Sequence, residues 1–146
     1  MSTVSKIAPE TLAFGLLTVT EAAARAAYHW IGRGDKNGGD EVAVTAMRKA
    51  LNNLPIRGKI VIGEGAKDEA PELYQGERVG SGHGPEMDIA VDPIEGTTNM
   101  AENMPNSMAV IAAAPAGARL DPGPCYYMQK FAAPPVARGK IAHDRV

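Results

Sequence analysis

Residues 87–98, Met-Asp-Ile-Ala-Val-Asp-Pro-Ile-Glu-Gly-Thr-Thr, join an apolar run to two carboxylates and a proline. The run favours a buried strand that ends at Asp92, because Pro93 has no N–H to donate to a strand ladder. Glu95 follows three residues after Asp92, just before a turn. The strand is therefore expected to present Asp92 and Glu95 on one side of a tight loop.

Two carboxylates held this close together favour a bound cation. They repel each other unless a cation lies between them or one of them takes up a proton. Oxygen ligands alone favour a hard cation such as Mg²⁺ or Mn²⁺. The backbone carbonyl of Ile94 is a further candidate ligand, and the Thr97 hydroxyl is placed to hold a water at the rim. The alternative for this pattern by itself is an Asp-Pro turn with an exposed glutamate, since Asp, Pro and Gly mark turns.

Three other segments combine glycine or proline with charged residues: Gly32–Asn37 (Gly-Arg-Gly-Asp-Lys-Asn), Ile60–Gly65 (Ile-Val-Ile-Gly-Glu-Gly) and Asp68–Pro71 (Asp-Glu-Ala-Pro). Together with Asp88–Thr97, they resemble bacterial class II fructose-1,6-bisphosphatase, a member of the lithium-sensitive, metal-dependent phosphatase superfamily. The resemblance runs in order and without large gaps over about residues 20–130. Four such motifs in register are hard to produce by accident.

The resemblance implies a metal site and a substrate site on these segments. Mg²⁺ or Mn²⁺ would be bound by Asp40, Glu64, Asp92, Ile94 and Glu95. The catalytic residues would be Thr97, Asp40 and Asp68, with Thr97, oriented by Asp40, placing the attacking water in line with phosphorus. The substrate would be contacted by Lys36, Gly96, Thr97 and Tyr127.

The residues alone leave simpler alternatives open at four of these positions. Asp40 also suits the N-cap of a helix expected over residues 41–53, and Lys36 also suits a solvated loop. Glu64 follows a short strand over residues 59–63, where an ordinary polar turn is the alternative. Tyr127 also suits a core or edge position on a later strand.

The fold class that the resemblance implies is α/β, with a layered mixed sheet and packed helices. Residues 1–131 would form the N-terminal part of the sugar-phosphatase fold, and residues 132–146 would lie outside the resemblance. The implied activity is hydrolysis of the 1-phosphate of fructose 1,6-bisphosphate to fructose 6-phosphate and phosphate, a reaction of gluconeogenesis. Divalent cations would neutralise the phosphate oxygens and acidify a water.

The other elements follow from periodicity and turn residues. Residues 9–31 show an apolar face at steps of three and four, which predicts a helix serving as scaffold or subunit contact. Residues 32–40 are expected to form a polar, glycine-rich loop. Residues 80–85 are expected to connect residues 78–79 to the next strand as a hairpin. Residues 107–114 predict a strand buried on both faces.

The acidic segment over residues 66–77 is expected to be mostly solvated surface, apart from Asp68. The composition excludes several other classes of protein. A net charge of −2 gives no basic excess for holding nucleic acid, and 45% hydrophobic residues suffice for a core. One cysteine, Cys125, excludes an internal disulfide framework and a cysteine-based zinc site. No apolar run is long enough to span a membrane, and no secretory signal is visible, so the cytoplasm is expected.

Family members are considerably longer than this chain, and their second half supplies another metal-binding glutamate and basic residues that hold the other phosphate. The expected partners are therefore a sugar bisphosphate and either further copies of the chain or a complementing subunit. Three alternatives stay open: a sister phosphatase acting on sedoheptulose 1,7-bisphosphate, inositol phosphate or a nucleotide bisphosphate; a non-catalytic fragment that binds a phosphatase subunit; and a metal-binding domain without chemistry.

Overall fold

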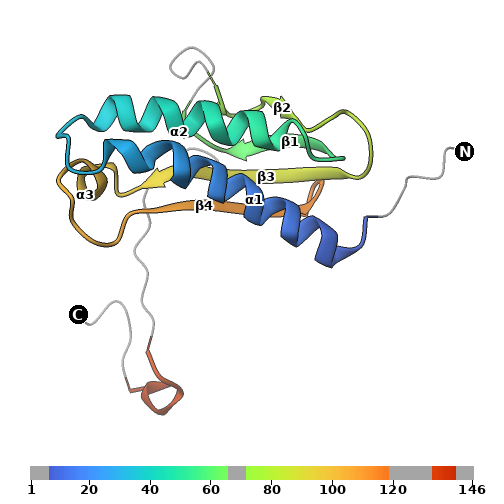
Figure 1. Ribbon diagram of the computed structural model, residues 1–146. Coiled ribbons are helices and arrows are strands. Elements are labelled where there is room, and N and C mark those ends of the chain that lie inside the picture. Colours follow the sequence, from blue (N-terminus) through green and yellow to red (C-terminus); the bar gives the residue numbers. More distant parts are fainter. Residues whose placement is uncertain (1–6, 66–71, 119–132, 141–146) are drawn as a thin grey trace, which may run out of the picture.

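A mixed sheet forms the centre of the protein. The structure, a computed structural model, describes residues 7–65, 72–118 and 133–140. In these residues four strands form one sheet in the order β2-β1-β3-β4 (Figure 1). The strands are β1 (Arg57–Ile62), β2 (Arg78–Val79), β3 (Glu86–Glu95) and β4 (Met108–Pro115). β1 and β3 run parallel, whereas β2 and β4 are antiparallel to their neighbours.

Two long helices cover one face of this sheet (Figure 1). They are α1 (Pro9–Ala27), continued by the 3₁₀ turn η1 (Tyr28–Trp30), and α2 (Lys36–Leu51). The short elements α3 (Thr97–Ala101) and η2 (Pro135–Ala137) complete the set that the structure describes. The α/β class with a mixed sheet and packed helices is therefore confirmed, as is the helix predicted over residues 9–31. Across the described ranges, every helix is too short or too polar to traverse a lipid bilayer.

One apolar layer lies between the helices and the sheet. α1 contributes the small residues Val19 and Ala23, both fully buried, which allows it to pack closely against α2. The larger fully buried side chains of the layer are Met47, Leu51, Ile56, Ile60, Leu73 and Ile89. Burying one side chain of this size stabilises a fold by about 1.5–3 kcal/mol. The layer therefore holds α2 firmly against β3.

The start of α2 differs from the sequence prediction. The helix begins at Lys36, not after residue 40, and its N-cap is Asp35, whose side chain accepts a hydrogen bond from the Gly38 N–H at 2.9 Å. The prediction of a loop over residues 32–40 is therefore wrong for its second half. So is the alternative that Asp40 caps the helix, because Asp40 lies inside its first turns.

Two glycines misled that prediction, because they usually weaken a helix. Here both glycines lie under closely packed side chains. A Cβ added at Gly38 would lie 2.3 Å from the Trp30 ring, and one at Gly39 would lie 2.3 Å from the Met100 methyl group. The glycines thus let the N-terminus of α2 approach both η1 and α3.

The hairpin predicted around residues 80–85 is also wrong. β2 pairs with β1, not with β3, so that Gly58 lies between Val79 on one side and Met87 on the other. The connection crosses the start of β1 closely. A Cβ at Gly84 would lie 2.0 Å from the Pro55 carbonyl oxygen, and Gly84 has φ +89°. The glycine-rich loop therefore carries the chain from β2 past β1 to β3. Residue types alone do not distinguish such a crossover from a hairpin, because both use glycine.

β4 is buried on only one face, contrary to the prediction for residues 107–114. Ala109 and Ile111 pack against the core, while Met108 and Val110 point the other way and are exposed. The many small apolar residues of this strand are compatible with either arrangement. Among the described residues, no helix covers this second face of the sheet.

Glu77 corrects the expectation of a solvated acidic segment. It is buried, pairs with Arg48, and accepts a hydrogen bond from the Leu73 N–H. Glu72 lies 3.6 Å from the same guanidinium. These carboxylates attach the segment before β2 to α2, a contact between distant parts of the sequence that local charge density does not reveal.

Candidate functional site

The candidate site lies where the parallel strands β1 and β3 end. The N-terminal end of α2 and the short helix α3 lie at this same end of the sheet (Figure 1). In open α/β sheets, ligands bind outside the carboxyl ends of the strands. Four of the predicted site carboxylates come from these elements: Asp40 from α2, Glu64 from the loop after β1, and Asp92 and Glu95 from β3.

A β-bulge brings Asp92 and Glu95 to one side of β3. Asp92 pairs with Val110 of β4 and Glu95 pairs with Met108, so β3 has one residue more than β4 between these pairs. In a regular strand, residues three apart point to opposite faces, and the extra residue corrects this. Pro93, which donates no ladder hydrogen bond, lies at the irregularity. The strand thus continues to Glu95 through a bulge, where the sequence predicted that it ends at Asp92.

Glu64 is positioned by a close contact between two loops. The Glu64 N–H donates to the Leu73 carbonyl at 3.1 Å, and the Gln75 N–H donates to the Gly65 carbonyl at 2.9 Å. A Cβ at Gly63 would lie 2.0 Å from the Leu73 carbonyl oxygen, so only glycine permits this approach. Gly63 permits this close approach, and the two hydrogen bonds fix the backbone of Glu64 just beyond β1.

Helices α2 and α3 supply the remaining described candidates. Lys36 and Asp40 are four residues apart on α2 and therefore share one of its faces. Gly96, with φ +80°, is the N-cap of α3, and Thr97 is its first residue. Because Met100 of α3 packs on α2 at the residue before Asp40, these two helix starts are neighbours.

Burial and neighbouring carboxylates raise the pKa of two carboxyl groups at this end, Glu64 and Asp92. Burial raises the pKa of Glu64 to about 7, and the charges of Asp40 and Asp92 add to the shift. Burial raises the pKa of Asp92 to about 6, and a hydrogen bond to Glu95 and its charge add to this. A backbone hydrogen bond at Ile94 acts in the opposite direction. Burial also raises the pKa of Asp40.

The four carboxylates are therefore electrostatic neighbours, although they are up to 55 positions apart in the sequence, from 40 to 95. Among the described residues, no lysine or arginine offsets the shifts of Asp40, Glu64 and Asp92. Within those same ranges, no three potential metal-ligating side chains already lie in the geometry of a cation site. The arrangement is thus a concentration of negative charge rather than a closed coordination shell.

The structure does not test the roles of the other predicted site residues. Asp68 and Tyr127 lie outside the described residues. The side chain of Ile94 is buried, which is compatible with a role only for its backbone carbonyl. Lys36 is exposed at the start of α2. The roles of all these residues stay predictions.

Sequence reasoning assigned no part to Asp88, although it belongs to the motif of β3. Asp88 is buried and accepts a hydrogen bond from the Gly117 N–H at 2.8 Å, which secures the turn after β4. Its position four residues before Asp92 placed it on the same strand. Only the pairing of β3 with β4 shows its partner.

Comparison with known proteins identifies the class to which this sheet and its acidic end belong. The family described as bacterial fructose-1,6-bisphosphatase, glpX-encoded, matches residues 10–146. The chain belongs to this family. The resemblance found from the four motifs is therefore confirmed.

Individual relatives agree with this assignment. Proteins named D-fructose 1,6-bisphosphatase class 2/sedoheptulose 1,7-bisphosphatase from Prochlorococcus marinus, strains MIT 9303 and MIT 9313, are 52% identical to this chain over 131 residues. The protein of the same name from Parasynechococcus marenigrum, strain WH8102, is 52% identical over 132 residues. Each alignment covers 90% of this chain and 39% of the relative. The chain thus spans about two fifths of the length of these curated relatives.

Proposed function

We propose that this chain supplies the metal-binding part of a fructose-1,6-bisphosphatase that releases the 1-phosphate of fructose 1,6-bisphosphate. The observation that supports the proposal is electrostatic: the charges of Asp40 and Asp92 act on Glu64, and those of Glu95 and Asp40 act on Asp92. Membership of the family and the names of its relatives support the same reaction. The product would enter gluconeogenesis, and the reaction would take place in the cytoplasm.

The residues present suit a divalent cation by their chemistry. All four side-chain donors are carboxylate oxygens, which favour Mg²⁺ or Mn²⁺ over softer metals. The raised pKa values of Glu64 and Asp92 indicate that the charged forms of these two groups are disfavoured, and a bound cation would relieve this. Asp40, Glu64, Asp92, Glu95 and the Ile94 carbonyl would hold the ion. When bound, it would supply positive charge to the phosphate oxygens and lower the pKa of a water.

The chain's own groups would orient the reactants around this ion. Thr97 is the first residue of α3, where its hydroxyl would orient a water or a phosphate oxygen. Asp40, from the neighbouring helix, would accept a hydrogen bond from the Thr97 hydroxyl and so fix its direction. Gly96 has no side chain, which would let a phosphate approach the backbone at this turn. Lys36 would face the substrate's negative charge from one turn before Asp40.

Two predicted groups complete this proposal from outside the described residues. Asp68 would act close to the attacked phosphorus, and Tyr127 would contact the sugar phosphate. We further propose that residues 1–131 form one continuous part of the phosphatase domain. Further copies of the chain, or a complementing subunit, would contribute the contacts to the second phosphate.

The experiment measures phosphate release from fructose 1,6-bisphosphate by the chain alone and by the chain fused to the remaining sequence of a Prochlorococcus relative. We expect the fusion to release phosphate in Mg²⁺ or Mn²⁺ and to release none in EDTA. The sugar product should be fructose 6-phosphate. Asp92→Asn should abolish it, and Asp35→Asn, which keeps the N-cap of α2, should not. A fusion that folds, binds the cation and releases no phosphate would contradict the proposal.

The choice of substrate needs its own comparison, because the relatives' name includes sedoheptulose 1,7-bisphosphatase. The same fusion is therefore assayed with sedoheptulose 1,7-bisphosphate and with inositol 1-phosphate. We expect the highest kcat/KM for fructose 1,6-bisphosphate. A higher value for another substrate would reassign the specificity while leaving the metal-dependent chemistry in place.

A further inference from the structure

The segment before β2 lies against the end of β1 and the loop that follows it. Within residues 72–77, the Glu77 carbonyl accepts a hydrogen bond from the Ile60 N–H at 2.9 Å. Just beyond the strand, the Leu73 carbonyl accepts the Glu64 N–H at 3.1 Å. The place of Glu64 therefore depends on how residues 72–77 are held.

Leu73 has an unfavourable backbone conformation. Its φ of +55° lies in the left-handed region, which residues other than glycine seldom adopt. Such a conformation persists only where the surrounding structure imposes it, and it occurs often at functional sites. The Leu73 side chain is fully buried, its N–H donates to the Glu77 side chain, and its carbonyl accepts the Glu64 N–H. These three contacts impose the conformation that directs the Leu73 carbonyl at Glu64.

Glu77 receives the Leu73 N–H and is itself held in place. Its side chain is only 4% exposed, and its other oxygen pairs with the Arg48 guanidinium of α2. A hydrogen bond to an ionised acceptor is stronger than one between neutral groups. An unbroken chain of contacts therefore runs from α2 through Arg48, Glu77 and Leu73 to the backbone of Glu64.

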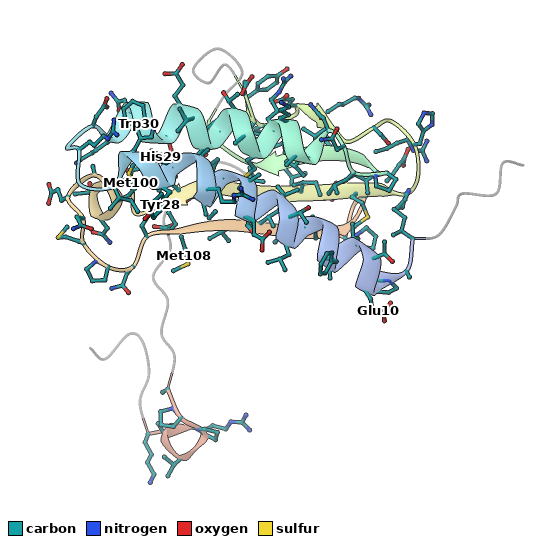
Figure 2. All side chains as sticks on the ribbon, in the orientation of Figure 1. Glu10, Tyr28, His29, Trp30, Met100 and Met108 are labelled. Carbon is teal, nitrogen blue, oxygen red and sulfur yellow. The ribbon has the colours of Figure 1, made fainter. Side chains whose placement is uncertain are left out.

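The same helix carries Asp40, another of the proposed cation ligands. Asp40 lies eight residues before Arg48, about 12 Å along the helix axis. It belongs to the helix start that packs beside Trp30 and Met100, both labelled in Figure 2. The chain of contacts therefore fixes the backbone of Glu64 relative to the helix that carries Asp40.

We propose that Glu77 is a positioning residue of the cation site: by accepting the Leu73 N–H, it keeps the Leu73 carbonyl directed at the Glu64 N–H. The inference rests on the proposed function, which makes Glu64 a ligand of the cation. Glu77 acts through Leu73 and not by contact with the cation. What this role requires at position 77 is an acceptor oxygen rather than a charge. Glu77→Gln keeps such an oxygen, whereas Glu77→Leu, with a side chain of similar size, removes it.

The first test measures amide hydrogen exchange by nuclear magnetic resonance in the cation-free chain. The Glu64 and Ile60 amides both donate to residues 72–77, but the acceptor of the Ile60 N–H is the backbone carbonyl of Glu77. Glu77→Leu should speed exchange at Glu64 at least about tenfold relative to Ile60, because it frees Leu73. Glu77→Gln should leave this ratio at its wild-type value. A loss of stability by itself would speed both amides and leave the ratio unchanged.

Two outcomes of the exchange measurement would overturn the proposal. One is an unchanged ratio of the Glu64 and Ile60 rates in Glu77→Leu. The other is an equal rise of this ratio in Glu77→Gln and Glu77→Leu, which would assign the effect to the lost charge rather than to the lost acceptor.

A measurement on the wild-type chain requires no variant to fold. Scalar couplings across hydrogen bonds should join the Leu73 amide nitrogen to the Glu77 carboxyl carbon. They should also join the Glu64 amide nitrogen to the Leu73 carbonyl carbon. If either coupling is missing from the folded chain, the proposed relay from Glu77 to Glu64 is wrong.

The last test measures Mn²⁺ binding by electron paramagnetic resonance. Glu77→Leu should raise the Mn²⁺ dissociation constant about tenfold or more, as the loss of a group that orients a metal ligand commonly does. Glu77→Gln should bind Mn²⁺ like the wild-type chain. Asp88→Ala is the matched control, because it removes another carboxylate that accepts a backbone N–H, close to the start of β3. It should leave the dissociation constant unchanged.

The two kinds of measurement separate the positioning of Glu64 from the proposed function. Wild-type Mn²⁺ affinity in Glu77→Leu, or an equal loss of affinity in Asp88→Ala, would overturn the role of Glu77. Hydrogen exchange requires no cation. A wild-type chain that binds no Mn²⁺, together with the expected exchange ratios, would therefore contradict the proposed function and support the positioning of Glu64 by Glu77.

Discussion

Glu64 and Glu77 lie within thirteen positions of each other in the chain, and both are shielded from water to some degree, yet their surroundings are opposite. Glu77 pairs with Arg48 and accepts the Leu73 N–H, so both of its oxygens have partners. Glu64 faces the negative charges of Asp40 and Asp92. Even its backbone is fixed by Leu73, the residue that also binds Glu77.

The difference separates a carboxylate that stabilises the fold from one that destabilises it. A buried charge with a partner and hydrogen bonds is maintained by the structure around it. A partly buried charge among like charges is unfavourable unless a cation arrives, and such groups concentrate at functional sites. Gly63 permits the close approach of Leu73, and the hydrogen bond from the Glu64 N–H to the Leu73 carbonyl holds Glu64 in this unfavourable place.

The largest expected difference between the two is in catalysis. Glu64→Gln in an active context, such as the fusion to a relative's remaining sequence, should lower kcat/KM for fructose 1,6-bisphosphate at least about 10²-fold, since it would remove a proposed ligand of the cation. Glu77→Gln should change kcat by less than about threefold at a temperature where the variant is folded. Steady-state phosphate release measures both, and equal losses would remove the distinction between the two residues.

The next difference is in stability: substitution of the two glutamates should change the free energy of unfolding in opposite directions. Glu77→Gln should lower the free energy of unfolding by about 2 kcal/mol, less than for a fully buried pair because the Arg48 side chain is 39% exposed. Glu64→Gln should raise the free energy of unfolding at pH 8 without divalent cations, because it removes like-charge repulsion. Urea unfolding monitored by circular dichroism checks both. Destabilisation by both substitutions would contradict the view that the charge of Glu64 is unfavourable in the cation-free fold.

The pH dependence sharpens the same comparison. The pKa of Glu64 is about 7 in the folded chain, above its ordinary 4.5, and that of Asp92 is about 6, above 3.8. The folded state therefore binds more protons than the unfolded state between these values, and stability falls as the pH rises through them. The stabilising effect of Glu64→Gln should be near zero at pH 4.5 and grow up to about pH 8. A gain that is independent of pH would show that the charge of Glu64 is not its cause.

The smallest expected effect concerns two aspartates at the start of α2. Asp35→Ala removes the N-cap and should lower the free energy of unfolding by about 1 kcal/mol. Asp40→Asn should not destabilise the cation-free chain at pH 8, because burial disfavours the charge of Asp40. Thermal unfolding of the two variants gives the comparison. A larger loss of unfolding free energy in Asp40→Asn than in Asp35→Ala would contradict the assignment of Asp35 as the cap.

The sequence predicts the elements better than their connections. The first helix and the strand that contains Asp92 follow from periodicity and turn residues, and the α/β class follows from the family resemblance. The early start of α2 does not, because two glycines argue against a helix, and the packing of Trp30 and Met100 on them is not visible in the local sequence. The crossover through residues 80–85 and the exposed face of β4 also depend on strand pairing, which no local pattern encodes.

The candidate site shows the same limit. Motif resemblance selected Asp40, Glu64, Asp92 and Glu95, and the charges of the other three act on the pKa of Glu64 or of Asp92. The bulge at Pro93 was predicted only as the end of a strand, because a proline shows where a ladder is interrupted but not how it resumes. Glu77 was assigned to the solvated surface, because its partner Arg48 is 29 positions away.

The central claim is that Asp40, Glu64, Asp92 and Glu95 bind divalent cations jointly. Electron paramagnetic resonance of Mn²⁺ measures it most directly, because the signal of free Mn²⁺ falls as the ion binds. We expect the wild-type chain at pH 8 to bind at least one Mn²⁺, Glu64→Gln and Asp92→Asn each to lose that binding, and Glu77→Gln to retain it. Equal binding by all four proteins, or none by the folded wild-type chain, would contradict the claim.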